Sequence, residues 1–431
     1  MSKHLIEVDA VHDTGPGAVR VVTMSTIAFT LMFAVWLMFG ILGIPIQEEL
    51  GLSDEQLSWI SAFAVLNGSM WRLPAGILTD RIGGRRVTLF MLFATAIPAY
   101  FVSVANNYVM LLVLAFLVGF AGNLFSVGTA WNSAWFVKDR QGLALGIFGA
   151  GNVGASVTKF IGPALITATS GAVFVFGVQG GWRLIPVIYA VLLVIVGVVT
   201  WLVVPRVDRA PGSSKPIREM LQPLRHIRVW RFSLYYVAVF GAYVALSAWL
   251  PKYYTDNFGI SLRDAGLLAA TFIFPASLLR PLGGWLSDRW GARGAMYWTF
   301  AGMLLTSGLL IIPNNIITLV PFVLLVFLLG CAMGIGKAAV YKHIPEYFPD
   351  NVGSVGGLVG MLGGLGGFVL PPLFAYTKTW SGFPTSTFVC LFALVAACAI
   401  WMHVTILQMP RQGTTKSAAA VVAATINEDG E

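Results

Sequence analysis

Apolar stretches of about 20 residues recur along the whole chain, and the segments that join them are mostly short and polar. A helix of about 20 apolar residues spans the ~30 Å hydrocarbon core of a lipid bilayer. Charged residues make up only 11% of the 431 positions, whereas a soluble domain carries roughly 25%. We count twelve such stretches, at residues 22–45, 56–79, 87–105, 108–136, 141–169, 183–204, 231–254, 263–286, 294–312, 317–341, 352–376 and 384–408. The sequence therefore predicts an all-α membrane protein with twelve transmembrane helices.

Positive charges are distributed unevenly between the two sets of connections. If both termini lie inside, most of the 27 lysine and arginine residues fall in the tails and the inner connections. The outer connections then hold only Arg183, Lys252, Arg263 and Lys378. Inner loops of membrane proteins carry such an excess, so we expect a multi-pass protein of the cell inner membrane with both termini in the cytoplasm. The net charge of +8 thus reports orientation and does not indicate a nucleic-acid partner.

The longest polar connection divides the chain into two parts of similar length. It lies at 205–230 and is rich in arginine. We predict five regions: a cytoplasmic tail at 1–21, a six-helix half at 22–204, a cytoplasmic linker at 205–230, a second six-helix half at 231–408 and a cytoplasmic tail at 409–431. The other connections are too short to hold a soluble domain, so the function must reside in the helices.

One segment occurs twice, at an offset of 208 residues. Residues 72–85 read RLPAGILTDRIGGR and residues 280–293 read RPLGGWLSDRWGAR, with identity at 72/280, 76/284, 80/288, 81/289, 83/291 and 85/293. Each copy places an arginine, Arg72 or Arg280, eight residues before an aspartate at the inner end of a span, which is about 12 Å into the membrane. Such a repeat predicts two pseudo-symmetric six-helix halves with a binding site between them near the middle of the membrane.

The two repeated arginines need a negative partner inside the membrane. A guanidinium group keeps its proton on burial, so an anion must compensate its charge. No acidic residue lies in the interior of a predicted span, and Asp80 and Asp288 lie at helix ends beside the arginines of the repeat. The expected partner is therefore the cargo, bound between Arg72 and Arg280. The planar donors of arginine suit a small, flat oxyanion.

Two spans are unusually rich in glycine. One contains Gly149, Gly151 and Gly154, the other Gly360, Gly363 and Gly364. Small residues at such spacings let helices approach closely, and they also expose backbone that a small substrate can touch. Both interpretations remain open at this point. Asn152 is the one amide in its run and is a candidate donor to the anion.

The sequence contains no pattern typical of an enzyme, a metal site or a cofactor site. Residues 149–154 satisfy G-x-G-x-x-G, but they lie in a hydrophobic helix without the strand and the acidic residue that dinucleotide binding requires. The cysteines lie inside predicted spans without metal-ligand spacing; they are Cys331, Cys390 and Cys398. We expect no catalytic residue, no metal, no cofactor and no obligate protein partner.

The segment from Gly76 to Arg86 resembles the motif that the major facilitator superfamily carries between its second and third helices. That resemblance implies the major facilitator fold, and a role in gating the cytoplasmic side for a set of six residues: Asp80, Arg81, Arg85, Asp288, Arg289 and Arg293. With the paired arginines and the glycine-rich spans, residues 22–408 resemble the nitrate/nitrite porter family, the NarK-type transporters. The resemblance also implies further contacts to the anion, namely the phenyl rings of Phe125 and Phe240 and the hydroxyl of Tyr236.

Two lysines, Lys159 and Lys337, also lie inside predicted spans. A desolvated lysine near fixed positive charge can lose its proton near neutral pH, and an arriving anion would favour its return. The alternative is that each side chain reaches the membrane surface. The exchanger branch of the family that the chain resembles lacks basic residues at these positions. We therefore predict import of nitrate, or of nitrite, together with protons by alternating access, as in the nitrate/proton symport branch.

Other functions fit parts of the same pattern. A nitrate/nitrite antiporter needs no titrating group, because it exchanges equal charges. An anion channel or a nitrate sensor on the same fold would share the binding site, and transporters of small organic phosphates also use paired arginines. Saturable counterflow would exclude a channel, and a sensor would bind nitrate without moving it.

Overall fold

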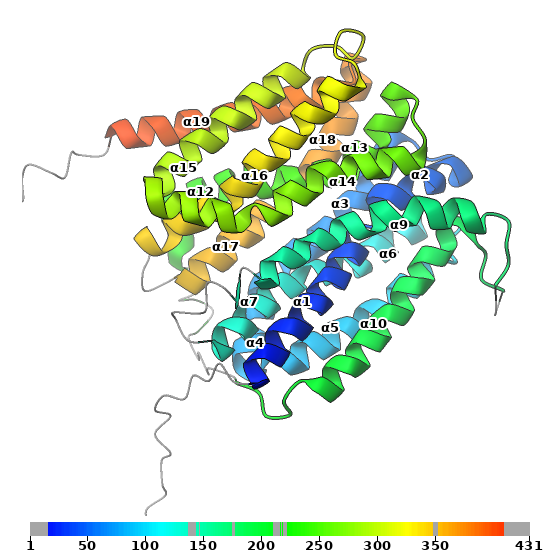
Figure 1. Cartoon of the computed structure of the whole chain (residues 1–431), viewed down its shortest axis with the longest axis horizontal. Helices are drawn as coiled ribbons and strands as arrows, with labels where there is room; N and C mark the ends of the chain where they lie inside the picture. The colour runs from blue at the N-terminus through cyan, green and yellow to red at the C-terminus, as the bar shows by residue number, and fades with distance from the viewer. Residues whose placement is uncertain are drawn as a thin grey trace, which may run out of the picture.

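Helices form nearly all of the described part of the chain (Figure 1). The structure is a computed structural model, and it describes residues 16–136, 144–145, 147–174, 177–209, 216, 218, 222–347 and 352–408. The first half contains α1 (Pro16–Trp36), α2 (Phe39–Leu50), α3 (Asp54–Met70), α4 (Arg72–Ile82), α5 (Gly84–Val102), α6 (Tyr108–Gly119), η1 (Phe120–Asn123), α7 (Leu124–Trp135), η2 (Gly151–Val153), α9 (Gly154–Thr169), η4 (Gly181–Arg183) and α10 (Leu184–Val203).

The second half follows with η5 (Gln222–Arg225), α12 (Ile227–Tyr236), η6 (Val237–Gly241), α13 (Ala242–Phe258), α14 (Leu262–Leu278), α15 (Arg280–Leu310), α16 (Leu319–Tyr347), α17 (Val352–Gly364), α18 (Gly366–Ser381) and α19 (Ser386–Gln408). Most of the predicted tail 1–21, part of the predicted linker 205–230 and the whole predicted tail 409–431 lie outside the described residues.

Two helices begin before the apolar stretch from which the sequence analysis recognised them. α1 begins at Pro16, where the predicted span starts at 22, and α12 begins at Ile227, where the predicted span starts at 231. Hydropathy marks the part of a helix that lies in lipid, whereas the helix itself continues into the polar flank.

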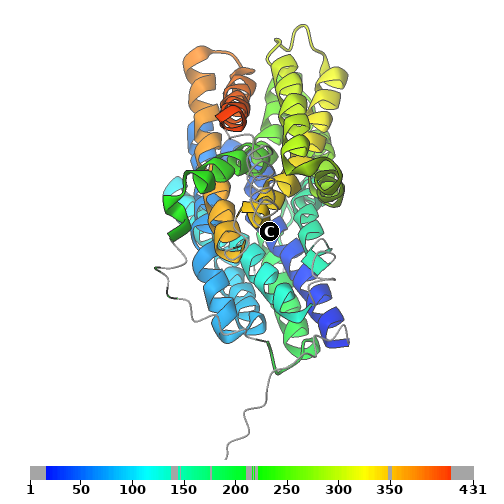
Figure 2. The same cartoon turned by 90° about the vertical axis from the view of Figure 1, so that its left-hand side faces the viewer.

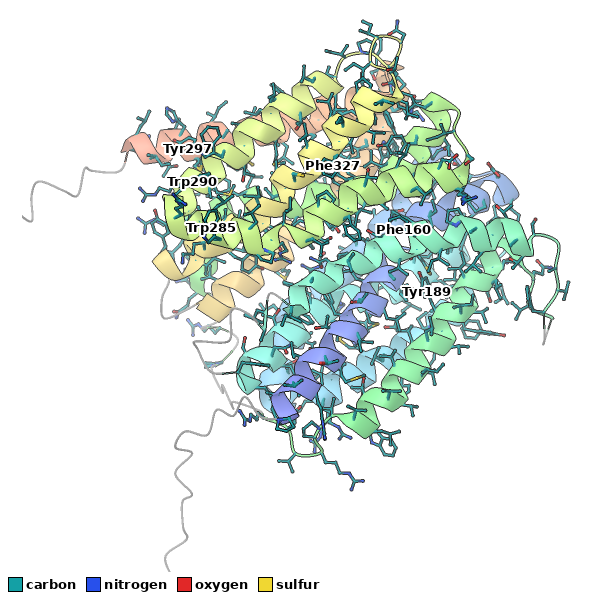
Figure 3. All side chains as sticks on the ribbon, viewed as in Figure 1. Phe160, Tyr189, Trp285, Trp290, Tyr297 and Phe327 are labelled. Atoms are coloured by element: carbon teal, nitrogen blue, oxygen red, sulfur yellow. The ribbon has the colours of Figure 1, made fainter. Side chains whose placement is uncertain are left out.

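Nine helical stretches in the described residues are long and apolar enough to cross a membrane. The other three predicted spans are also helical where they are described. They correspond to α3 with α4, to η2 with α9, and to the second part of α15. The protein is therefore an all-α membrane protein with twelve transmembrane helices, as the sequence predicts. Large apolar side chains such as Phe160, Trp285 and Trp290 are exposed on the outside of the bundle, where lipid would cover them (Figure 3).

The helices form two groups. In Figure 1 the first half, coloured blue to green, lies in the lower part of the molecule, and the second half, coloured green to red, lies in the upper part. Figure 2 shows the same two groups from the side at which α1 begins and α19 ends. We call this side the proximal end. The opposite side, which holds the α2–α3, α13–α14 and α18–α19 connections, is called the distal end.

The two halves repeat each other in backbone conformation as well as in sequence. A break separates α3 from α4 at Trp71 (φ −93°, ψ 3°), and an equivalent break separates α14 from α15 at Leu279 (φ −83°, ψ 4°). Further along, Gly83 (φ 88°, ψ 147°) and Gly291 (φ 74°, ψ 152°) adopt a second shared conformation that glycine permits. The halves are thus pseudo-symmetric, and each places its repeated arginine directly after a break.

Helices from the two halves pack against each other along the interface. α9 contacts α14, α3 contacts α18, α2 contacts α13, and α4 contacts α17. At the distal end, ion pairs cross the interface. Asp54 at the start of α3 pairs with Lys378 (2.6 Å) and Lys252 (3.2 Å), and Asp256 pairs with the same lysines at 3.2 and 3.0 Å. We call these four residues the distal ion network.

Asp54 is the first residue of α3 and lies outside the predicted span 56–79. Burial opposes its ionisation, but hydrogen bonds from Lys378 and Gln47 and the charge of Lys252 together lower its pKa from 3.8 to about 2. A lowered pKa stabilises the paired state fully at pH values above 3.8, and this stabilisation is lost as the pH falls through about 2. The distal ion network is therefore intact throughout the physiological pH range.

Candidate functional site

Arg72 begins α4 directly after the break at Trp71 and is only 1% exposed. Its Nε donates to the carbonyl of Gly68 (3.0 Å), and its Nη1 donates across the interface to the carbonyl of Gly360 (3.2 Å). Its Nη2 is buried, and no described residue bonds it. The backbone of both halves thus fixes this guanidinium group and leaves Nη2 without a described partner.

Arg280 begins α15 at the equivalent break and reaches the same region from the second half. The guanidinium carbons of Arg72 and Arg280 lie 5.5 and 5.7 Å from the centre of the Phe125 ring, so their separation cannot exceed the sum of these distances. They are close enough to repel each other. Nη1 of Arg280 is buried, and no described residue bonds it. Neither arginine forms an ion pair with a carboxylate in the described part of the chain.

Aromatic side chains surround these two charges. Phe125 touches both arginines, and the ring of Phe240 lies 5.1 Å from the guanidinium carbon of Arg72. Tyr236 is fully buried and stacks on Phe240 at 5.0 Å and 10°. Tyr341, which the sequence analysis did not single out, packs edge-on against Tyr236 at 5.1 Å. The structure thus brings together the three aromatic residues that the family resemblance implied.

Trp36 is a residue of the site that the sequence analysis missed. The guanidinium carbon of Arg72 lies 5.5 Å from its ring, and its indole N–H donates to the carbonyl of Ala64 at 2.9 Å. A Cβ at Gly68 or Gly122 would lie 2.5 or 2.6 Å from this indole. A tryptophan in the middle of a span must find an acceptor away from water. That requirement was the signal available in the sequence.

The glycines of α17 let its backbone approach the site closely. Gly360 supplies the carbonyl that accepts from Arg72. A Cβ at Gly363 would lie 2.4 Å from the Tyr236 ring, and one at Gly364 would lie 3.4 Å from Nη1 of Arg72. These three glycines therefore fit both interpretations: they allow the helices to pack closely, and they bring the backbone of α17 to the site.

The glycines around η2 divide between two functions. A Cβ at Gly154 would lie 1.9 Å from the carbonyl oxygen of Thr30, and one at Gly151 would lie 2.7 Å from a ring carbon of α1. These two residues therefore serve helix packing. Gly149 instead faces the second half, since a Cβ there would lie 3.7 Å from Nη1 of Arg280.

Asn152 is buried (1% exposed), and no described residue bonds either polar atom of its side chain. It follows Gly149 by three residues, and residues at that spacing share one face of a helical turn. This spacing is consistent with a position of Asn152 on the same side of the helix as Gly149, which faces Arg280.

The two predicted coupling lysines are both fully buried, but their surroundings differ. Among the described residues, the one hydrogen bond of Lys159 is to the carbonyl of Ala155 in its own helix, at 3.3 Å. Lys337 donates to the carbonyl of Ala276 in α14 at 3.0 Å, and its ammonium nitrogen lies 3.1 Å from the centre of the Tyr243 ring. Neither side chain reaches the membrane surface.

Two of the predicted gating arginines form bonds within their own half. Arg85 donates to the carbonyl of Trp201 at 2.7 Å, and Nε of Arg293 donates to the hydroxyl of Tyr347 at 3.1 Å. Arg81 and Arg289 are exposed. The side chains of the two predicted gating aspartates, 80 and 288, lie outside the described part of the structure. In contrast, the ion pairs described between the halves lie at the distal end.

Asp208, which the sequence analysis did not single out, holds the proximal end of the first half together. Its carboxylate accepts from the backbone N–H of Arg85 (2.7 Å), from the indoles of Trp131 (3.0 Å) and Trp135 (2.9 Å), and from the N–H of the residue that follows it (2.8 Å). It also lies against Gly83, where a Cβ would be 2.7 Å from its oxygen. The positive φ and this close approach both require glycine there.

We expect Asp208→Asn to destabilise the protein by about 2 kcal/mol, because an amide turns a donor toward groups that are themselves donors. The melting temperature of the purified protein in detergent measures this effect. Asp264→Asn is the matched control, since Asp264 is exposed and accepts only from the hydroxyl of Ser261 among the side-chain bonds described. Equal melting temperatures for the two variants would contradict the structural role of Asp208.

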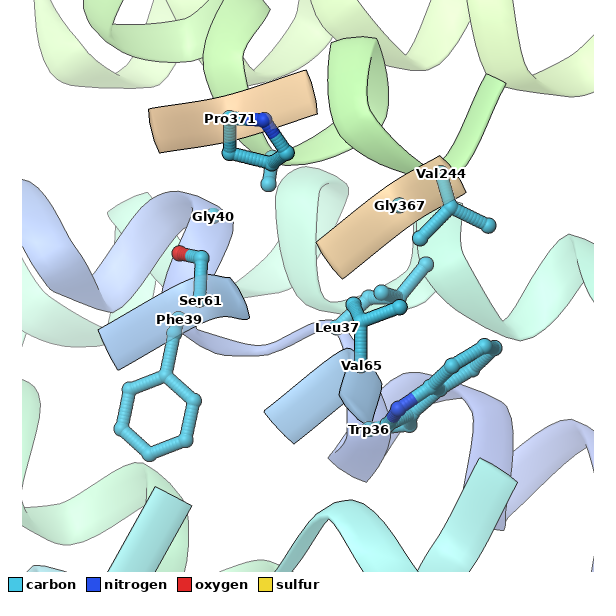
Figure 4. Close-up of a pocket in the computed structure, with 10 residues that line it drawn as sticks. Trp36, Leu37, Phe39, Gly40, Ser61, Val65, Val244, Gly367 and Pro371 are labelled. Carbon is cyan, nitrogen blue, oxygen red and sulfur yellow. The ribbon is translucent and has the colours of Figure 1, made fainter. Parts of the chain in front are cut away.

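Two small cavities follow the interface from the site toward the distal end. The first, of about 10 Å³, is lined by residues of both halves that include Trp36, Val65 and Val244 (Figure 4). The second, of about 20 Å³, shares Ser61 with the first and extends to Lys252 of the distal ion network. Volumes of this size hold about one water molecule. Neither of these two cavities is large enough to admit an anion.

Comparison with known proteins identifies the family of the chain. A model of the Major Facilitator Superfamily matches residues 24–371 and 232–427. The chain resembles the solved structure of a bacterial homologue of the human lysosomal transporter Spinster with a TM-score of 0.71 and 16% identity, over 92% of this chain and 98% of that one. It resembles the nucleoside transporter NupG with a TM-score of 0.68 and 13% identity, over 90% and 99%. These two similarities establish the fold.

Sequence relatives are much more similar. The chain is 64% identical over 414 residues to the "Probable nitrate/nitrite antiporter NarK1" of Thermus thermophilus, which covers 92% of this chain and 94% of that protein. It is 30% identical over 384 residues to the "Nitrite extrusion protein" of Bacillus subtilis (88% and 93%). It is 31% identical over 383 residues to the "Probable nitrate transporter NarT" of Staphylococcus epidermidis (87% and 93%). With its helical fold and its duplicated arginines, the chain belongs to the major facilitator superfamily and, within it, to the NarK-type family of nitrate/nitrite porters.

Proposed function

We propose that this protein carries nitrate, and also nitrite, across the membrane by alternating access, with the anion bound between Arg72 and Arg280. One observation carries the proposal. A permanent cation from each half touches the same ring, Phe125, and no described carboxylate pairs with either. Arg72 is 1% exposed, and Arg280 is partly buried. An uncompensated buried guanidinium group costs several kcal/mol, so an anion between the two compensates the charge of Arg72 and offsets its repulsion from Arg280.

The polar atoms around the two charges fit a small oxyanion. Arg72, Arg280, Asn152 and Tyr236 each keep a buried donor that no described residue bonds. Nitrate and nitrite can accept a hydrogen bond at each oxygen, and their flat shape matches the planar guanidinium donors. Aromatic walls exclude water, which strengthens these bonds. The names of the relatives refer to the same two anions.

Charge distribution supports an orientation for the protein in the cell inner membrane, with both termini in the cytoplasm. Lysine and arginine are concentrated in the tails and in the proximal connections, as inner loops require. In this orientation the distal end faces outward. The distal ion network then closes the outer side, so the structure represents a state closed to the outside.

Import of the anion together with protons is the coupling that we propose. A monovalent anion that enters against an inside-negative potential needs a driving ion. Lys159 and Lys337 are buried, protonatable and without a carboxylate partner in the described part of the protein.

Exchange of nitrate for nitrite is the second candidate. The relative that is 64% identical is named a probable nitrate/nitrite antiporter, and this name favours exchange. Exchange of equal charges needs no proton.

Uptake by the purified protein in liposomes tests both candidates. Vesicles with and without internal nitrite receive external nitrate at a series of external pH values, and the internal nitrate is measured by ion chromatography. We expect uptake without internal nitrite, with a rate that increases as the outside is made more acidic. Uptake that requires internal nitrite would establish exchange instead. Transport of phosphate but of neither nitrogen oxyanion would refute the proposal as a whole.

Weakening the distal ion network should open the outer side more often. We expect Asp54→Asn to increase the population open to the outside about five-fold, since an ion-pair contribution of about 1 kcal/mol is lost. Ser61→Cys provides the readout, because Ser61 lines both distal cavities. Its labelling by a membrane-impermeant thiol reagent should become about five times faster when Asp54→Asn is added, relative to Ser61→Cys alone.

Lys378→Gln provides the corresponding control, because it removes the partner that lies 2.6 Å from Asp54. The double variant should label little faster than either single variant, since residues that act in one contact have non-additive effects. Labelling rates that are unaffected by both changes would show that the network does not hold the outer side closed.

A further inference from the structure

Lys337 is the buried lysine that contacts the candidate anion site. Its ammonium nitrogen lies 5.8 Å from the centre of the Phe240 ring, and the guanidinium carbon of Arg72 lies 5.1 Å from the same ring centre. Arg280 is close enough to Lys337 for their charges to repel. Lys337 therefore lies against the same ring as Arg72, and it also lies within electrostatic range of Arg280.

The groups that face Lys337 come from several helices, and in the described residues none is negatively charged. η6 contributes the ring of Phe240, and α13 contributes the face of Tyr243, whose hydroxyl is hydrogen-bonded to Ser277 at 3.1 Å. α14 contributes the carbonyl of Ala276. α15 contributes the charge of Arg280. Among the described residues named above, the charged and titratable groups near the lysine are thus Arg280 and the phenol of Tyr243.

We propose that Lys337 carries the proton that accompanies the anion: its amine is neutral while the site is empty and accepts a proton when nitrate binds between Arg72 and Arg280. This inference depends on the proposed function, and it assigns the coupling to one residue. While the site is empty, burial and the repulsion from Arg280 both disfavour a charged ammonium group at Lys337. A bound anion cancels one positive charge beside Arg280, so the ammonium form becomes favourable.

Charge and protons balance over the cycle. The empty site holds two arginine charges and a neutral lysine. The loaded site holds the same two charges, one anion and one ammonium group, so its net charge is unchanged. The proton enters from water on the outer side as the anion binds. It leaves to the cytoplasm after the anion departs, when the repulsion from Arg280 returns. One anion and one proton cross together, and transport is electrically neutral.

The hydrogen bond of Lys337 gives this coupling a mechanical route. Its acceptor is Ala276, which precedes Arg280 by four residues, about one helical turn. The break at Leu279 lies between them. A movement of Arg280 toward the anion would thus displace the acceptor that the lysine uses.

Lys159 lacks these connections. Its hydrogen bond is to its own helix, and no charged group acts on it in the described residues. It lies in α9, seven residues beyond Asn152 toward the distal end. The anion would therefore change the surroundings of Lys159 much less than those of Lys337.

Two measurements test the assignment. The first records proton uptake on nitrate binding by the wild-type protein in weakly buffered detergent solution, with a pH indicator. We expect about one proton per anion bound near neutral pH. Binding without proton uptake would overturn the inference and leave the proposed binding site intact. Absence of nitrate binding would refute the proposed function itself.

The second measurement compares Lys337→Gln with Lys159→Gln, a matched change of a buried lysine, in liposomes. An acidic outside should stimulate net nitrate uptake in wild type, and we expect this stimulation to be at least ten-fold smaller in Lys337→Gln. Nitrate–nitrite exchange by Lys337→Gln should remain measurable and should no longer depend on pH. Lys159→Gln should keep the stimulation by pH. Loss of stimulation in Lys159→Gln alone, or its retention in Lys337→Gln, would overturn the assignment. Measurable exchange confirms that a variant is folded.

Discussion

Arg72→Lys is expected to lower nitrate uptake at least 100-fold, although the positive charge is kept. The guanidinium group binds the carbonyls of Gly68 and Gly360 at the same time and keeps a third nitrogen free. A lysine has one nitrogen and cannot make these contacts together. It also lacks the flat surface that faces Phe125 and Phe240. Loss of one bidentate charge-assisted contact and of these bonds amounts to roughly 3 kcal/mol, or about 100-fold.

Initial uptake rates in liposomes and nitrate titrations of the purified variant measure this effect. Arg280→Lys is the matched change in the second half, where no hydrogen bond of the guanidinium group is described. We expect a comparable loss of uptake for Arg280→Lys with a smaller loss of thermal stability, because of the two arginines only Arg72 has described hydrogen bonds to the backbone of both halves. Near-normal uptake by both variants would refute recognition of the anion by paired guanidinium groups.

Gly363→Ala is expected to weaken nitrate binding at least 30-fold by displacing Tyr236. The added Cβ would lie 2.4 Å from a ring carbon of Tyr236 and 2.7 Å from its Cβ. The tyrosine cannot move freely, since it stacks on Phe240 and packs edge-on against Tyr341. A small shift of these rings would misplace the walls of the site, and errors of about 1 Å in a binding site cost roughly 100-fold in rate or affinity. Nitrate titration of the purified variant measures the loss.

Gly357→Ala is the control in the same helix. A Cβ there would meet only the end of the Leu73 side chain, at 3.6 Å, which is an ordinary contact. Both changes gain about 1 kcal/mol of helix propensity, so this effect cancels between them. We expect Gly357→Ala to bind nitrate within a factor of about two of wild type. Equal affinities of the two variants would show that the approach of α17 to Tyr236 is not needed for binding.

The breaks beside the arginines show where hydropathy stops being informative. The sequence analysis treated 56–79 and 263–286 as continuous spans, yet each is interrupted just before its arginine, at Trp71 and at Leu279. A signal was present, because Pro74 and Pro281 lie in the first turn of the following helix, where proline is tolerated. Hydropathy does not detect such a break, since both sides of it are apolar.

The aromatic residues of the site could not be found from their own sequence context. Phe125, Phe240 and Tyr236 were predicted because of the family resemblance, and Trp36 and Tyr341 were not predicted at all. The chain has 29 phenylalanines and 14 tryptophans, most of which can serve equally well against lipid or neighbouring helices. Only the position of a ring relative to a charge separates these uses.

The sequence by itself determined the fold class and the family, and it showed one arginine inside a predicted span at the equivalent position of each half. These properties depend on hydropathy, on duplication and on motifs within single segments, and all of them are local. The tertiary structure decided which atoms meet. The contact between Arg72 and Gly360 joins residues 288 positions apart, and the ring of Phe125 lies against both arginines. It also distinguished Lys337 from Lys159, which are equivalent by hydropathy. Such distinctions depend on how distant helices pack, because the electrostatic environment of a buried charge is set by its neighbours in space.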